Sequence, residues 1–205
     1  MPGEHYYASR PTSAHKPCQF SFTHRDRTFD LVSDAGVFSH QHLDRGTKLL
    51  LKALAVPPAA ARLADLGCGY GPIGLVLASL APLAEVYLID PNERACDLAM
   101  KNAIRNGLEN IIVKRGEGLA GVPGPIDLIA TNPPIRAGKQ AIYGLMAEAA
   151  ERLSQGGELW TVVRTNQGAE SLKRELCRLF PDVSEMEKGG GFRVYRAVKS
   201  RSPPI

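Results

Sequence analysis

The sequence predicts an α/β protein with a mostly parallel sheet that is covered by helices on both faces. The 205 residues, 44% hydrophobic and 22% charged, fit one domain that buries a core without disulfides or a structural metal. From residue 62 onward, short apolar segments alternate with helical segments of 9–16 residues, which is typical of βαβ units. A glycine-rich turn follows the first of these strands, where a parallel sheet binds ligands.

Residues 1–42 are predicted to form an N-terminal extension that contains a β-hairpin. Apolar and polar residues alternate in Phe20–Phe22 and in Thr28–Val32, with a polar turn at 24–27 between them. All five histidines lie in this part, at positions 5, 15, 24, 40 and 42. No third ligand type is clustered near the last two, so we predict no metal site.

Residues 43–199 are predicted to form the main domain. A helical pattern runs from Leu43 until Pro57 and Pro58 end it. The expected strands are then 62–66, 85–90, 111–114, 127–131 and 158–164, and the expected helices are 72–80, 93–106, 139–154 and 168–180. Residues 183–188 and 192–198 flank three glycines and predict a closing antiparallel hairpin. Residues 200–205 are expected to be a disordered tail.

Composition excludes several classes of protein. The longest apolar run, 49–56, contains Lys52 and is far shorter than the roughly 20 residues that cross a membrane. No secretory signal is present, and the four separated cysteines suit a reducing compartment, so we expect a cytoplasmic protein without a membrane partner. The net charge of +4 is concentrated toward the two ends, which fits either a nucleic-acid substrate or a solvated basic face.

The segment from Leu63 to Gly74 predicts a cofactor loop. Gly69, Gly71 and Gly74 satisfy the dinucleotide fingerprint, but that pattern alone is weak. Asp65 stands just before the glycines, where its carboxylate would repel a pyrophosphate. The same carboxylate would attract the sulfonium and ammonium groups of S-adenosylmethionine. The sequence therefore favours a cationic cofactor.

Two later strand ends extend the predicted site. Asp90 ends the next strand, where an acidic side chain binds ribose hydroxyls, and a helix N-cap before Pro91 is the alternative explanation. Asn132, Pro133 and Pro134 follow a buried strand, and the prolines remove backbone donors so that carbonyls and the Asn132 amide face the cleft. Such acceptors would hold an NH₂ group and expose its lone pair without a strong general base.

These residues resemble the class I S-adenosylmethionine-dependent methyltransferases. The chain is similar in particular to the methyltransferase small domain family, which contains bacterial ribosomal RNA guanine-N2 methyltransferases. The resemblance covers almost the whole chain and rests on segments 5–7, 33–39, 43–47, 65–71, 131–139, 157–160 and 167–168. It implies a Rossmann-like sheet of seven strands, mostly parallel, that ends in an antiparallel hairpin.

The resemblance also implies roles for individual residues. The expected cofactor contacts are Asp65, Gly67, Gly69 and Gly71 at the methionine part, Asp90 at the ribose, Glu117 near the adenine, Phe38 closing the pocket, and Asn132. Asn132 and the Pro133 carbonyl would position the target amine as the catalytic pair. The expected substrate contacts are Pro134, Ile135, Arg136 and Lys139. Ile135 replaces the aromatic residue usual after Asn-Pro-Pro, so Tyr143 or Phe38 would have to stack on the substrate instead.

The predicted function is transfer of a methyl group from S-adenosylmethionine to an exocyclic amine, with guanine N2 of ribosomal RNA as the expected acceptor. A protein glutamine or adenine N6 is the alternative acceptor. A nicotinamide-dependent oxidoreductase and a non-catalytic RNA-binding module are further alternatives. At 205 residues the chain is too short for the degenerate second half that the ribosomal RNA guanine enzymes usually carry, which leaves the acceptor open.

Overall fold

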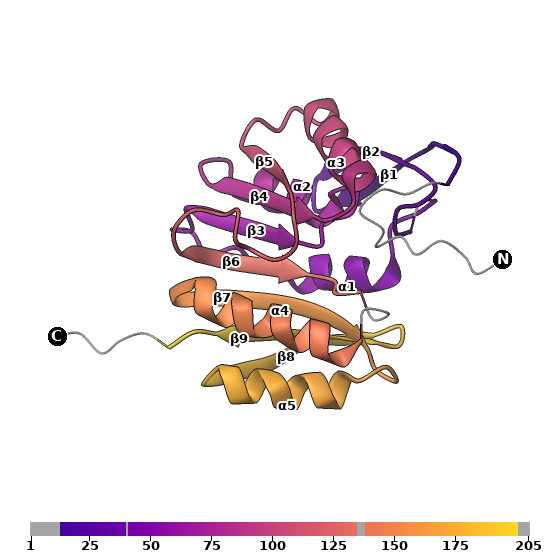
Figure 1. The fold of residues 1–205 in the computed structure, drawn as a ribbon. Helices are drawn as coiled ribbons and strands as arrows, with labels where there is room; N and C mark the ends of the chain where they lie inside the picture. Colours follow the sequence, from indigo (N-terminus) through magenta and orange to yellow (C-terminus); the bar gives the residue numbers. More distant parts are fainter. Residues whose placement is uncertain (1–12, 40, 135–137, 201–205) are drawn as a thin grey trace.

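The computed structural model describes residues 13–39, 41–134 and 138–200, and it contains a seven-stranded sheet (Figure 1). In order across the sheet, the strands are β5 (Ile111–Arg115), β4 (Glu85–Asp90), β3 (Arg62–Leu66), β6 (Ile126–Thr131), β7 (Leu153–Arg164), β9 (Phe192–Val198) and β8 (Asp182–Gly189). The first five are parallel, and β9 runs antiparallel to both neighbours. The predicted fold class is confirmed.

The helices divide between the two faces of this sheet. They are α1 (Arg45–Ala53), α2 (Pro72–Leu80), α3 (Glu93–Arg105), α4 (Lys139–Arg152) and α5 (Ala169–Leu179). One apolar core joins α1, α2 and α3 to one face through side chains such as Leu50, Leu75 and Trp160. The second core joins α4 and α5 to the other face through Met146 and Leu172 (Figure 1).

The order of the strands leaves an opening for a ligand. The chain builds β3, β4 and β5 toward one edge and then returns to place β6 on the other side of β3. The connections after β3 and β6 therefore leave the sheet in opposite directions. The carboxyl ends of these two strands flank a crevice, as in other open α/β sheets. The glycine loop after β3 and the Asn-Pro-Pro segment after β6 both lie at this edge.

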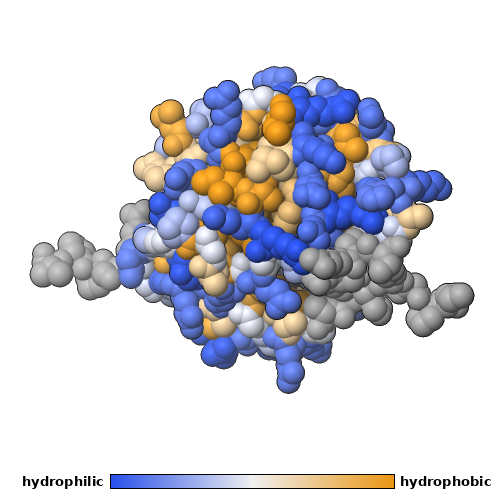
Figure 2. Space-filling view, turned by 45° about the horizontal axis from the view of Figure 1, so that its top comes forward, coloured by the Kyte–Doolittle hydropathy of each residue, from blue (hydrophilic) through white to orange (hydrophobic). Residues whose placement is uncertain are grey.

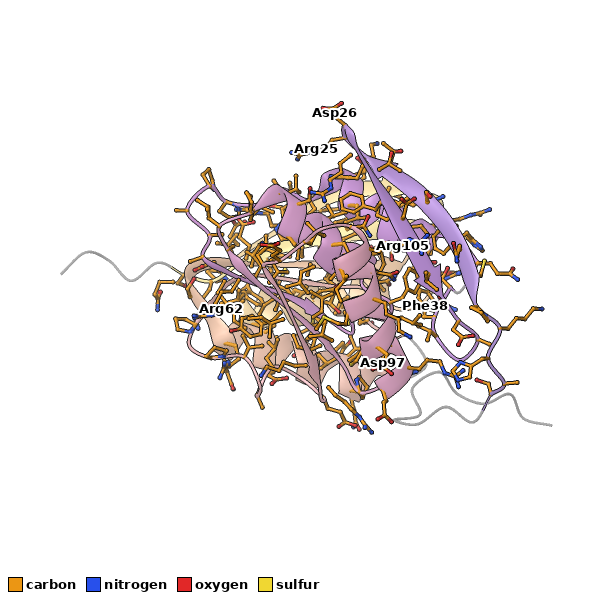
Figure 3. All side chains as sticks on the ribbon, turned by 90° about the horizontal axis from the view of Figure 1, so that it is seen from above. Arg25, Asp26, Phe38, Arg62, Asp97 and Arg105 are labelled. Carbon is orange, nitrogen blue, oxygen red and sulfur yellow. The ribbon has the colours of Figure 1, made fainter. Side chains whose placement is uncertain are left out.

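The predicted N-terminal hairpin is present as β1 (Cys18–His24) and β2 (Arg27–Ser33), which pair in one antiparallel register. Phe29 and Leu31 of β2 are buried in the same core as α2 and α3. Figure 3 shows the hairpin beside α3, with Arg25 and Asp26 at its turn. The hairpin therefore shares the core of the main domain, and the boundary placed after residue 42 stays a prediction.

Two asparagines of α3 hold the edge of β2. The amide of Asn102 accepts from Val32 N at 2.8 Å and donates to Val32 O at 2.9 Å, and Asn106 makes the same pair of bonds with Asp30. Asn102 also donates to Tyr70 O in the glycine loop. Because the residues are one helical turn apart and their partners alternate along β2, the two amides replace a neighbouring strand.

Some boundaries differ from those expected. α1 begins at Arg45, not at Leu43, because Asp44 adopts a non-helical conformation (φ −57°, ψ 145°) and its side chain caps the helix. β7 begins at Leu153, because Leu153 already pairs with Ile126 before a register shift leads into the expected strand. Positions 201–205 lie outside the described residues, so the expected disordered tail is untested.

On the face shown in Figure 2, hydrophilic side chains surround one joined apolar group near the centre and several smaller ones. Exposed apolar side chains include Met100 and Ile104 on α3. None of the helices in the described ranges has both the length and the apolar composition required to cross a bilayer.

Replacement of Asn102 by alanine is expected to destabilise the fold by about 3 kcal/mol, because this fully buried side chain makes three hydrogen bonds to backbone groups, two of which are partly buried and one, Tyr70 O, fully buried. Asn106→Ala is the matched control. It also removes three hydrogen bonds, but its two bonds to Asp30 are exposed and only the bond to Asn102 O is partly buried, so it should cost about 1 kcal/mol. Urea unfolding of both variants measures the difference. Equal losses would contradict the proposed role of the buried amide.

Candidate functional site

A cavity of about 640 Å³ lies at the carboxyl ends of β3, β4 and β6. One part is lined by the glycine loop, the end of β4 and the segment after the hairpin, with residues Val37, Phe38, Gly67, Cys68, Gly69, Tyr70, Pro72, Ile73, Asp90, Pro91, Asn92 and Ala95. The other part is lined by Asp44, Thr47, Asn132, Pro133, Pro134, Arg164, Gln167 and Phe192. We call these the loop half and the Asn132 half of the cavity.

The glycines of the loop have two different functions. Gly67 and Gly69 line the cavity with φ of 74° and 56°, and a Cβ at Gly67 would meet nothing within 4 Å. The missing side chains therefore leave the backbone open to a ligand. Gly71 is not among the lining residues. Its φ is 95°, and a Cβ there would lie 3.1 Å from Leu88 and 3.3 Å from Ala99, so it serves the packing of α2.

Asp65 lies beneath the glycine loop, not on the cavity wall. Its side chain is fully buried, and Oδ2 accepts a hydrogen bond from the backbone N of Gly74 at 2.8 Å. Oδ1 has no hydrogen-bond partner among the residues that the structure describes. Burial is the main cause that raises the pKa of Asp65 to about 7, and the nearby carboxylate of Asp90 adds to the rise. An unpartnered buried carboxylate oxygen favours a nearby cation.

Asp90 reaches the cavity and also organises its loop half. Oδ2 accepts from Gly69 N at 2.9 Å, and Oδ1 accepts from Asn92 N at 2.9 Å. Each carboxylate oxygen has a second lone pair, so these bonds leave capacity for hydroxyl donors. Burial raises the pKa of Asp90, while the two backbone bonds oppose that rise. The helix-cap alternative does not fit, because Asn92 caps α3 through Ala95 N.

The segment after the hairpin closes one side of the loop half. Asn92 Nδ2 donates to Gly36 O at 3.0 Å, and Arg94 donates to Ala35 O at 2.6 Å. These bonds anchor the segment that carries Val37 and Phe38, both of which line the cavity. Phe38 is 40% exposed and is labelled in Figure 3. Its position fits the predicted role in closing the pocket.

Asn132 is held from the side of α1. Its Nδ2 donates to Asp44 Oδ2 at 3.1 Å and to Thr47 Oγ1 at 3.0 Å. The structure shows no hydrogen bond to Oδ1 from the described residues. Pro133 and Pro134 also line the cavity, and neither has a backbone N–H. This corner therefore offers hydrogen-bond acceptors.

Several expected contacts are not on the cavity wall. Glu117 lies exposed in the loop after β5, and Lys139 is exposed at the start of α4. Tyr143 packs against the core beneath α4 and is not a lining residue. Ile135 and Arg136 lie outside the described residues. The structure thus brings together Phe38, Gly67, Gly69, Asp90 and the Asn-Pro-Pro segment from the predicted set.

Several lining residues were not predicted from the sequence, above all Asp44, Thr47 and Phe192. The Arg164 side chain lies over the Phe192 ring, 5.0 Å from its centroid, and both line the cavity with Gln167. Asp44 before an apolar helical pattern is a typical N-cap residue and indicates where the helix begins. This pattern did not reveal that Asp44 and Thr47 reach Asn132, which is 88 positions away from Asp44.

A metal site finds no support in the described ranges, which contain no group of three or more His, Cys, Asp or Glu side chains suited to bind an ion. His40 lies outside them, so the absence of a metal stays a prediction.

Comparison with known proteins gives consistent matches. A family model described as "Methyltransferase small domain" matches residues 28–196. An uncharacterised protein of Bacillus subtilis, YbxB, is 39% identical over 198 residues, which cover 96% of this chain and 98% of that protein. The ribosomal RNA small subunit methyltransferase C of Pseudomonas entomophila is 34% identical over 188 residues. That match covers 88% of this chain but only 54% of the Pseudomonas protein.

A solved structure agrees with the observed fold. A 16S rRNA N2 methyltransferase from T. thermophilus, in complex with AdoMet and guanosine, aligns with a TM-score of 0.80 at 24% identity. The alignment covers 92% of this chain and 52% of that chain. With a family model that spans most of the chain, the resemblance noted in the sequence is confirmed: the chain belongs to the methyltransferase small domain family of S-adenosylmethionine-dependent methyltransferases.

Proposed function

We propose that this methyltransferase acts on an exocyclic amino group, and that this group is guanine N2 of ribosomal RNA. The proposal rests on the hydrogen bonds of the Asn132 side-chain amide. Both hydrogens of its amide nitrogen are engaged by Asp44 and Thr47, and its carbonyl oxygen is left as an acceptor at the cavity. An acceptor that is fixed in this way suits a substrate that offers N–H donors.

The residues of the Asn132 half account for how the amine would react. The lone pair of an exocyclic amine is delocalised into its ring. If Asn132 Oδ1 and the Pro133 carbonyl accept its two hydrogens, they hold the nitrogen in a geometry that exposes the lone pair. When bound, S-adenosylmethionine supplies an electrophilic methyl group. Transfer forms the N–C bond, breaks the S–C bond and releases one proton from the nitrogen to solvent.

The loop half fits the cofactor on three observations. Gly67 and Gly69 leave the backbone open, Asp90 retains acceptor capacity for ribose hydroxyls, and Asp65 has an unpartnered oxygen beneath the loop. Through Asp65, the site would favour the positive charge of the sulfonium and ammonium groups. We assign these four residues and Phe38 to cofactor binding. Gly71 packs against Leu88 and Ala99 behind the loop, and Glu117 is exposed in the loop after β5, outside the cavity lining.

Both the relatives and the cavity favour RNA as the acceptor. The Pseudomonas relative is named as a ribosomal RNA methyltransferase, and the T. thermophilus structure contains guanosine. Arg164 lies at the cavity over Phe192, where a guanidinium plane can stack on a base or contact a phosphate. This arrangement would replace the aromatic residue missing at Ile135. Lys139 is exposed on α4, where it would contact the RNA backbone.

The test is methyl transfer from labelled S-adenosylmethionine to purified small ribosomal subunits, with free ribosomal RNA and protein fractions as alternative acceptors. Asn132→Ala is expected to lower kcat by roughly 100- to 1,000-fold, because the acceptor for the amine is removed. Its affinity for S-adenosylmethionine, measured by calorimetry, should stay within about 2-fold. Label in the protein fraction alone would refute the RNA acceptor. Lost cofactor affinity with retained turnover would refute the role of Asn132.

Asp65→Asn should have opposite effects on stability and on cofactor binding. The pKa of Asp65 lies near 7 in the fold and near 4 in the unfolded chain, so the folded state binds the proton more tightly. The wild type therefore loses stability as pH rises from about 4 to about 7, by up to roughly 4 kcal/mol from this group. The amide variant removes this penalty while it can still accept from Gly74 N.

Urea unfolding at pH 5 and pH 8 should show Asp65→Asn gaining stability over the wild type mainly at pH 8. Calorimetry should show its affinity for S-adenosylmethionine falling by roughly 10-fold, because the favourable charge is gone. Titration with NADH is the control, since an oxidoreductase site would bind it. If the variant binds S-adenosylmethionine as tightly as the wild type, the assignment of Asp65 to the cofactor is wrong.

A further inference from the structure

Asp44 and Thr47, at the start of α1, hold the side chain of Asn132 in one orientation. Asn132 Nδ2 donates to Asp44 Oδ2 at 3.1 Å and to Thr47 Oγ1 at 3.0 Å, which uses both of its hydrogens. We propose that Asp44 and Thr47 are positioning residues for methyl transfer, because they decide which atom of the Asn132 amide meets the substrate. This inference rests on the proposed function of Asn132.

The orientation matters because the two ends of an amide have opposite hydrogen-bonding character. If the amide turned by 180°, Nδ2 would face the substrate amine, and two donor groups would then oppose each other. Asp44 prevents this turn, because a carboxylate only accepts hydrogen bonds and would repel the amide oxygen. Thr47 alone would not be sufficient, since a hydroxyl group can both donate and accept. Asp44 therefore selects the orientation, and Thr47 completes it.

The position of Asp44 is fixed by the helix that it caps. Asp44 Oδ2 also accepts from Thr47 N at 3.0 Å, and the helix N-terminus favours a negative charge there. Helix α1 approaches β9 closely at Gly46. A Cβ at this position would lie 2.8 Å from the ring of Phe192 in β9 and 2.9 Å from Asp44 Oδ2. Leu50 and Leu51 are buried in the core beneath. The start of α1 is thus seated on the sheet beside Asn132.

The charge of Asp44 also acts in the direction that the reaction needs. Asp44 lines the cavity beside Asn132, and the amine nitrogen gains positive charge as its new bond forms. A carboxylate that accepts from the amide nitrogen polarises the amide and makes its oxygen a better acceptor. Both effects stabilise the transition state more than the bound substrate. The expected signature is a change in kcat with little change in KM.

Three variants separate positioning from folding. Thr47→Val keeps the shape of the side chain and the backbone bond to Asp44, but removes one acceptor of Asn132. Asp44→Ser keeps an N-cap hydroxyl that is too short to reach Asn132. Thr47→Ser is the matched control, because it retains the hydroxyl. We expect kcat to fall by roughly 10- to 100-fold in the first two and to stay near the wild-type value in the control.

Two further measurements make the result specific. Calorimetry should give the first two variants an affinity for S-adenosylmethionine within about 2-fold of the wild type. Hydrogen exchange of the Asn132 side-chain amide, followed by NMR of the ¹⁵N-labelled protein, should be slow in the wild type and in Thr47→Ser. It should be faster in Thr47→Val and Asp44→Ser, because the amide nitrogen has lost a partner. This readout requires no acceptor substrate.

The outcomes distinguish the inference from the function on which it rests. If the wild type methylates none of the fractions while the exchange pattern is as expected, the proposed acceptor is wrong. The orientation of the Asn132 amide by Asp44 and Thr47 is then still supported. If methylation occurs but Thr47→Val and Asp44→Ser keep the wild-type kcat, the positioning role is wrong. A loss of cofactor affinity equal to the loss of kcat would also overturn it, because it would indicate a general structural defect.

Discussion

Hydrogen bonds from backbone N–H groups to three carboxylates hold the cavity in shape. Asp65 accepts from Gly74, Asp90 accepts from Gly69 and Asn92, and Asp44 accepts from Thr47. In each case the donors lie at the beginning of a helix or in the loop before it, where backbone N–H groups lack partners within the helix. The carboxylates thus satisfy the backbone and at the same time place negative charge around the cavity. This charge opposes pyrophosphate and favours a cationic ligand.

Local sequence patterns were sufficient for most of the fold. The alternation of strands and helices after residue 62, the closing hairpin and the N-terminal hairpin were all read from periodicity, because each element buries one regular face. The predicted ends of elements were wrong where pairing with a strand distant in sequence sets the end. Leu153 belongs to β7 because Ile126 lies beside it, and nothing within the segment around Leu153 contains that information.

The candidate site was predictable only in part, for a related reason. The glycine loop and the Asn-Pro-Pro segment carry their own signals, since each follows a strand in sequence. The depth of Asp65 and the packing role of Gly71 depend on neighbours such as Leu88 and Ala99, which come from other elements. The contact of Asp44 with Asn132 is also set by the fold alone. A sequence motif therefore locates the site. Only the fold shows which residues of the motif line the cavity and which pack behind its lining.

The N-terminal part carries more of the site than its description as an extension suggests. β2 buries Phe29 and Leu31 in the main core, and the asparagines of α3 bind its edge. The segment after it brings Val37 and Phe38 to the loop half, directly before Asp44 at the start of the predicted main domain reaches the Asn132 half. The chain spans only 54% of the Pseudomonas relative, yet both halves of the cavity come from residues 37–192. The proposed cofactor and amine contacts therefore share one frame, and Arg164 stands at the same cavity over Phe192, where the proposed RNA acceptor would meet it.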